Sequence, residues 1–257
     1  MITFISPAKT LDFETEWHDK NCTEAPLLNH SKELVSILKK SKPEDLQKLM
    51  GISEKLATLN AERFGTWTIP MPKNKTKPAL RAFKGDVYVG IDIDTLKQKE
   101  INYLQKNLKI LSGLYGVLKP MDLILPYRLE MGTDLKNKKG KNLYAFWKNI
   151  LTEHIVKDAG LSEKNTVINL ASNEYFKAID TKILAAEIIT PIFKDWSSGK
   201  YKVISFHAKK ARGLMCRYMA QNNIKKAEDL RDFNLENYRY DSSESTENEF
   251  VFLRKSA

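Results

Sequence analysis

The chain has 257 residues, 42% of them hydrophobic, which is enough for one large domain or two small ones with a real core. Its 42 Lys and Arg against 32 Asp and Glu give a formal net charge of +10, which favours polyanionic partners such as nucleic acid, an anionic membrane face or phosphorylated ligands. The two cysteines and four histidines form no CxxC, HxxxH or HExxH pattern, so the sequence predicts no disulfide framework, no metal site and no cofactor.

The N-terminus lacks a basic segment followed by an apolar one, so it does not read as a signal peptide. No apolar run approaches the ~18–20 residues of a membrane span. We therefore expect a cytoplasmic protein without membrane association.

The chain begins with a short β-type run at Ile2–Ile5, followed at once by Ser6-Pro7-Ala8-Lys9-Thr10. A strand that runs into a loop carrying Ser, Lys and Thr is a favourable place to bind an anion. The glycines of a P-loop are missing, however. Lys9 is thus a candidate anion-binding residue, and a solvated surface lysine is the alternative.

The stretch LQKLMGISEKLATLN, residues 46–60, predicts two short helices joined by a tight turn at Gly51-Ile52-Ser53, with Ser53 as the N-cap of the second helix. Glycine would let a phosphate approach closely, the free N–H groups of the second helix would face it, and Lys55 would add a charge. The pattern resembles the helix-hairpin-helix DNA-binding motif LxxLxGIGxxxA, with Ser53 in place of the second glycine. We place this element at residues 44–63; an ordinary pair of packed helices is the alternative.

Further along, the sequence places candidate residues on a strand and in an irregular segment. Residues 83–90 alternate like a strand, with Lys84 and Asp86 on one face. Residues 101–115 have apolar positions at helical spacing and predict a helix that Pro120 stops. Arg128 and Glu130 follow in a segment too punctuated for regular structure, where binding groups often concentrate. A binding site and a surface ion pair are equally compatible with this pattern.

In the second half, residues 143–155 predict a helix and residues 167–171 a buried strand, and residues 188–193 and 201–206 predict a hairpin. The next helix starts near His207 and carries Lys209, Lys210 and Arg212. Two of these cations are expected in its first turn, where the helix dipole disfavours positive charge, so they are candidates for anion binding. We find no repeat and no linker, and expect one compact α/β domain over residues 1–257, a mixed sheet with surrounding helices.

Five motifs in this order resemble the YaaA family of bacterial peroxide-stress proteins: SPAKTLDF at 6–13, FKGDVYVG at 83–90, LSGLYGVLKPMDLILPYRLEMG at 111–132, NLASNEYFK at 169–177 and ISFHAKKARGLM at 204–215. The resemblance implies a peroxide-induced cytoplasmic protein that limits free intracellular iron. It also implies a single α/β domain with a basic cleft, a helix-hairpin-helix element and binding to duplex or branched DNA. The matching cleft cations are Lys9, Lys84, Arg128, Lys209, Lys210 and Arg212.

Two classes of function remain. The first is a monomer that binds DNA without sequence specificity and shields it, through Lys9, Gly51, Ser53, Lys55, Lys84, Arg128, Lys209, Lys210 and Arg212. The second is an enzyme acting on a small anionic substrate in the same cleft. Phosphate binding does not need the carboxylates of Asp12, Asp86, Asp122, Glu130 and Glu174, which could orient the cations or act as general acid and base beside Lys9 or Tyr115. No constellation names a reaction, so no catalytic residue is assigned and the first class is favoured.

Overall fold

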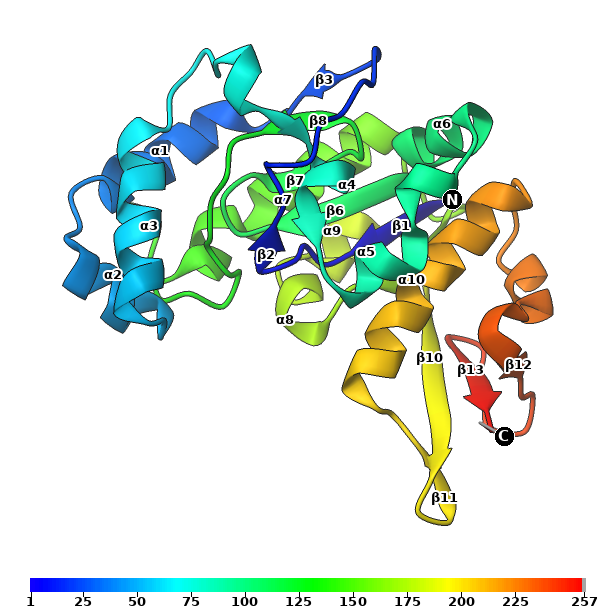
Figure 1. The fold of residues 1–257 in the computed structure, drawn as a ribbon. Helices are drawn as coiled ribbons and strands as arrows, with labels where there is room; N and C mark the ends of the chain where they lie inside the picture. The colour runs from blue at the N-terminus through cyan, green and yellow to red at the C-terminus, as the bar shows by residue number, and fades with distance from the viewer. Residues whose placement is uncertain (256–257) are drawn as a thin grey trace.

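A mixed sheet runs through the middle of the molecule (Figure 1), in a computed structural model that describes residues 1–255. Its strand order is β12-β13-β10-β9-β1-β6-β7, with β11 paired to β10. The inner pairs β10–β9, β9–β1 and β1–β6 are parallel, whereas β6–β7, β10–β11 and β12–β13 are antiparallel. The strands are β1 (Ile2–Ile5), β6 (Leu108–Ser112), β7 (Gly116–Leu118), β9 (Thr166–Leu170), β10 (Glu187–Ser197), β11 (Lys200–Lys202), β12 (Arg239–Tyr240) and β13 (Glu249–Arg254).

Helices surround this sheet, and two small strand groups lie beside it. α10 packs on α5, α6 and β10, while α7 packs on β7 and α9. β2 (Thr10–Leu11) pairs with β5 (Phe83–Lys84), and β8 (Asp122–Ile124) lies between β3 (Thr23–Glu24) and β4 (Lys77–Pro78). The helices are α1 (Leu28–Leu38), α2 (Pro43–Met50), α3 (Glu54–Thr66), α4 (Ala79–Ala82), α5 (Asp86–Ile91), α6 (Gln98–Asn107), α7 (Leu143–Ala159), α8 (Asn173–Phe176), α9 (Thr181–Leu184) and α10 (Ser205–Gln221). Short 3-10 helices are η1 (Lys73–Lys75), η2 (Ile93–Thr95), η3 (Glu228–Asp232) and η4 (Leu235–Asn237).

The expected α/β class with a mixed sheet and surrounding helices is confirmed. β1 is an inner strand of the sheet with all four residues buried, because β9 and β6 pair with its two edges and side chains cover both of its faces. The strand expected at 167–171 and the helix at 143–155 are also present. The hairpin expected from residues 188–193 and 201–206 is correct only in part: β10 continues to Ser197, residues 195–197 pair with residues 200–202, and β11 ends at Lys202 before α10 begins at Ser205.

The helix expected over residues 101–115 is wrong beyond Asn107. α6 ends there, and residues 108–112 form β6, whose five residues are all buried, Lys109 among them. In a strand that is buried on both faces, apolar and polar residues do not alternate. The apolar residues of β6 therefore also fitted the spacing expected for one face of a helix.

The strand expected over residues 83–90 is correct only for Phe83–Lys84, since α5 begins at Asp86. Lys84 and Asp86 therefore do not share a strand face. The reason is tertiary: α5 crosses α10 so closely that a Cβ at Gly213 would overlap the carbonyl oxygen of Val87. Packing against α10 favours the helix over local strand propensity.

The last long helix begins earlier than expected. α10 starts at Ser205, so Lys209 and Lys210 stand in its second turn. The dipole effect falls off within the first turn, so the argument that these lysines oppose the helix dipole does not hold. Within residues 1–255, no helix is long and apolar enough to cross a membrane.

Candidate functional site

One carboxylate joins two of the expected cations beside the central strand. Lys9 follows β1 and places Nζ 2.8 Å from Oε2 of Glu130, while Nη2 of Arg128 donates to Oε1 of the same residue at 3.0 Å. Arg128 and Glu130 keep only 17% and 23% of their side chains exposed, so this is a partly buried cluster. Nε of Arg128 is buried and has no hydrogen-bond partner among the described residues.

Lys84 lies next to this cluster because β2 pairs with β5, with Thr10 opposite Lys84. Its Nζ lies 2.6 Å from Oδ2 of Asp12, and Oδ1 of Asp12 lies 3.6 Å from Nζ of the buried Lys77. Asp12 also accepts hydrogen bonds from the backbone N–H groups of Glu14 and Thr15. The bond from Lys84 and those from Thr15 hold the pKa of Asp12 well below its usual range. Asp12 thus holds the loop through several hydrogen bonds and ion pairs, and its low pKa makes it a poor general base.

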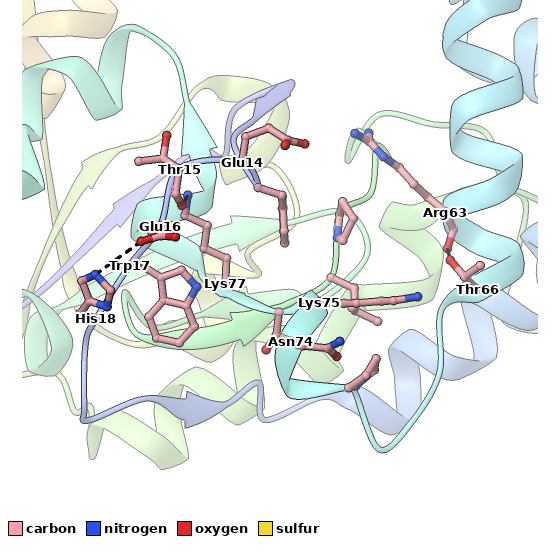
Figure 2. A pocket seen from close by; sticks show the side chains of 15 residues that line it. Glu14, Thr15, Glu16, Trp17, His18, Arg63, Thr66, Asn74, Lys75 and Lys77 are labelled. Carbon is pink, nitrogen blue, oxygen red and sulfur yellow. Dashed lines mark hydrogen bonds and ion pairs between the residues drawn. The ribbon is translucent and has the colours of Figure 1, made fainter.

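Two adjoining cavities open near this loop, and Asp12 lines the smaller of them. The larger, about 590 Å³, lies between the segment after β2 and the end of α3, and Figure 2 shows Trp17 and Arg63 on its two sides. The smaller, about 420 Å³, is lined by Lys84 and shares Thr15, Glu16 and Lys77 with the larger.

None of the nine expected site residues lines the larger cavity. Arg63 and Trp17 were missed because neither belongs to a motif with a recognisable spacing. Lys75 also lines the cavity and lies in the cation-rich stretch 72–84. That stretch was the sequence feature that could have indicated this cavity. Burial lowers the pKa of the Arg63 guanidinium.

The two helices expected around Gly51 are present as α2 and α3. Gly51 adopts the left-handed conformation at φ 61° and ψ 44°, and Ser53 Oγ accepts a hydrogen bond from the Leu56 N–H at 3.4 Å. A Cβ at Gly51 would have no atom within 4 Å, so the space next to Gly51 is open. Lys55 lies in the first turn of α3 and is exposed.

The three cations of α10 have different environments. Lys209 is exposed, and Lys210 forms an ion pair with Glu236. Arg212 is partly buried, and burial lowers the pKa of its guanidinium. The structure therefore joins Lys9 to Arg128 through Glu130, while Lys84 forms its ion pair with Asp12 on the adjoining β2–β5 pair and α10 packs on α5 just beyond it. The α2–α3 pair lies at the far left of the molecule, away from α10 (Figure 1).

Two side chains considered for acid–base chemistry belong to the core instead. Asp122 is 1% exposed and accepts hydrogen bonds from Thr23 Oγ1 at 2.5 Å and from the Lys119 N–H at 2.7 Å. Burial raises the pKa of Asp122 to about 6 against these bonds. Tyr115 is fully buried, accepts a hydrogen bond from Trp67 Nε1 at 3.0 Å, and its pKa is raised by burial to about 12.

The other carboxylates are placed differently. Glu174 accepts a hydrogen bond from the Gly132 N–H at 3.0 Å, and Asp86 is exposed in the first turn of α5. Across residues 1–255, no group of three or more His, Cys, Asp or Glu side chains is arranged to hold a metal ion.

Comparison with known proteins gives matches along nearly the whole chain. The family described as peroxide stress protein YaaA matches residues 1–244. A UPF0246 protein of Aliivibrio fischeri is 48% identical over 255 residues, covering 99% of this chain and 98% of the relative. A UPF0246 protein of Idiomarina loihiensis is 49% identical over 254 residues, with the same two coverages.

Proposed function

The chain belongs to the peroxide stress protein YaaA family, and we propose that it acts in peroxide stress by binding duplex or branched DNA without sequence specificity. In this proposal the bound protein shields the DNA and also limits free intracellular iron. It acts in the cytoplasm, as a monomer. Residues 44–63 serve as a helix-hairpin-helix element, and the cations near β1 and on α10 form a basic cleft.

The observation that carries the proposal is the turn between α2 and α3. The left-handed Gly51 faces open space, and α3 directs the N–H groups of its first turn toward the same end. Such an end binds phosphate through unpaired N–H groups and the positive end of the helix dipole. Exposed Lys55 adds a charge there.

The distribution of charge supports binding without sequence readout. The protein has a net charge of +10. The candidate DNA-binding cations lie on loops, a short strand and two helices, not on a single projecting recognition helix. Cations placed this way contact phosphates, which position a protein on DNA but carry no sequence information.

A second candidate function rests on the cluster of Lys9, Glu130 and Arg128. A buried guanidinium N–H without a partner is costly, and a bound anion could accept its hydrogen bond. Shared contact with Glu130 fixes both cations at defined positions. In this alternative a small anionic substrate binds at the cluster.

Glu130→Gln separates the two candidates, because it removes the carboxylate and frees both cations. If the cluster binds DNA phosphates, affinity for duplex DNA is kept or rises, and peroxide survival of cells carrying the variant is unchanged. If the cluster binds a small substrate, protection is lost while DNA affinity is kept, and that outcome would overturn the shielding mechanism.

Asp158→Asn is the matched control. Asp158 also holds two cations with one carboxylate, Lys109 and Lys119, and neither is a candidate site residue, so the charge change is the same away from the proposed cleft. Loss of protection in both variants would indicate a general effect of charge rather than a substrate site.

A further inference from the structure

The β10–β11 hairpin projects from the body of the molecule. β10 is 11 residues long and pairs with β13 as far as Asp195, and its last residues and β11 extend away from the helices at the bottom of Figure 1. Among residues 1–255, β11 pairs only with β10, so its other edge is unpaired in this part of the chain. A two-stranded hairpin adds little stability by itself. Stability therefore does not explain why this hairpin projects, and its surface residues become the relevant feature.

Exposed apolar side chains gather on this hairpin and at its base. Trp196 is 40% exposed and sits opposite Tyr201 on the neighbouring strand, with ring centroids 5.0 Å apart in an edge-to-face arrangement. Val203 and Phe206 follow β11 and are 56% and 57% exposed. Among residues 1–255 only two other large hydrophobic residues, Leu59 and Val89, are exposed, so three of the five gather at this hairpin.

The charge on the hairpin is positive. Lys200 and Lys202 lie on β11, and neither forms an ion pair among the described residues. Glu187 lies at the start of β10, away from the tip, and the carboxylate next to the tip, Asp195, is buried and held by Arg254 and by the hydroxyl of Tyr238. Among residues 194–202, therefore, no free acid opposes an anion.

We propose that this hairpin is a second DNA contact, in which Trp196 stacks on an unpaired base while Lys200 and Lys202 hold the flanking phosphates. Aromatic platforms beside cations bind single-stranded nucleic acid because every base has a π-face. An intact duplex keeps its bases stacked on one another, so the hairpin engages DNA where pairing is interrupted, at a gap, an end or a branch. The inference rests on the DNA binding proposed above and specifies which DNA structure is preferred.

The test compares an intact duplex with the same duplex carrying a short single-stranded gap, by fluorescence anisotropy. Trp196→Ala should weaken binding to the gapped DNA roughly 5- to 100-fold and leave intact-duplex affinity unchanged, whereas Trp196→Phe should keep most of the gap preference. Replacing Lys200 and Lys202 together by alanine should weaken binding to the gapped DNA and lower its salt slope by about 2, while binding to the intact duplex stays unchanged. Val89→Ala, at an exposed apolar residue of α5, is the control and should change neither affinity.

Several results would overturn the inference. One is an unchanged ratio of gapped to intact affinity in Trp196→Ala. Another is a wild-type dimer that this substitution dissociates in sedimentation, since the surface would then join two copies of the chain. Wild-type protein that binds neither DNA would refute the proposed function itself. Wild-type protein that binds both DNAs equally would refute only the role of the hairpin.

Discussion

Replacing Gly51 by valine tests the turn between α2 and α3, and Gly160 provides a matched control. Gly160 ends α7 at φ 59° and ψ 41°, nearly the angles of Gly51, and a Cβ at either position would have no atom within 4 Å. A side chain in this left-handed conformation costs roughly 1–2 kcal/mol, and somewhat more when β-branched. Both variants should therefore lose about the same stability, a fall of several degrees in Tm.

DNA affinity should distinguish the two variants. The valine at position 51 occupies the open space that a phosphate would enter, so the charge-assisted hydrogen bonds to the turn are lost, at about 1.5–3 kcal/mol each. Gly51→Val should thus weaken duplex binding roughly 10- to 150-fold at fixed salt, while Gly160→Val binds as the wild type does. Asparagine, which tolerates the left-handed conformation, can replace valine at both positions if folding suffers. Equal affinity for the two variants would refute the phosphate contact and leave the turn as a packing unit.

Three further predictions concern packing, pH and the α10 cations. Gly213→Ala should destabilise the protein by at least about 2 kcal/mol in urea unfolding because its Cβ overlaps α5, whereas Gly65→Ala, whose Cβ meets nothing in α3, should stabilise it by roughly 0.5–1 kcal/mol. Burial raises the pKa of Asp122 from 3.8 to about 6, so its contribution to stability should fall as pH rises from 3.8 to 6, and Asp122→Asn should reduce the change of the urea midpoint over that pH range. Lys209→Ala should lower the salt slope of DNA binding by about 1, and Lys209→Arg should leave it unchanged. If both variants lost DNA affinity equally, Lys209 would belong to a site that depends on the exact geometry of the lysine and not only on its charge.

The sequence predicted the elements whose pattern is local. The turn at Gly51 needed only a glycine and a capping serine, and the buried strand at Ile2–Ile5 needed only a short apolar run. β6 could not be separated from the preceding helix, because a strand buried on both faces and a buried helix give similar apolar runs. α5 depends on a crossing with Gly213, more than 100 residues away in the chain, and no local pattern reports such a contact.

The candidate site was predicted in part. Arg128 and Glu130 form the ion pair that the sequence offered as the alternative to a binding site, but the pair is partly buried and also includes Lys9. The sequence could not show that Asp12 holds Lys84, since that contact depends on β2 pairing with β5. The larger cavity was not predicted, because it joins the segment after β2 to the end of α3 through tertiary packing alone.

The salt dependence of duplex binding tests the central proposal most directly. Anisotropy titrations with two duplexes of unrelated sequence would follow affinity as salt is raised. If about 6 phosphates are contacted, the logarithm of affinity should fall linearly with the logarithm of salt, losing on the order of 10³ between 50 and 200 mM, equally for both sequences. A flat response, or one duplex bound far more tightly than the other, would contradict electrostatic binding without sequence specificity.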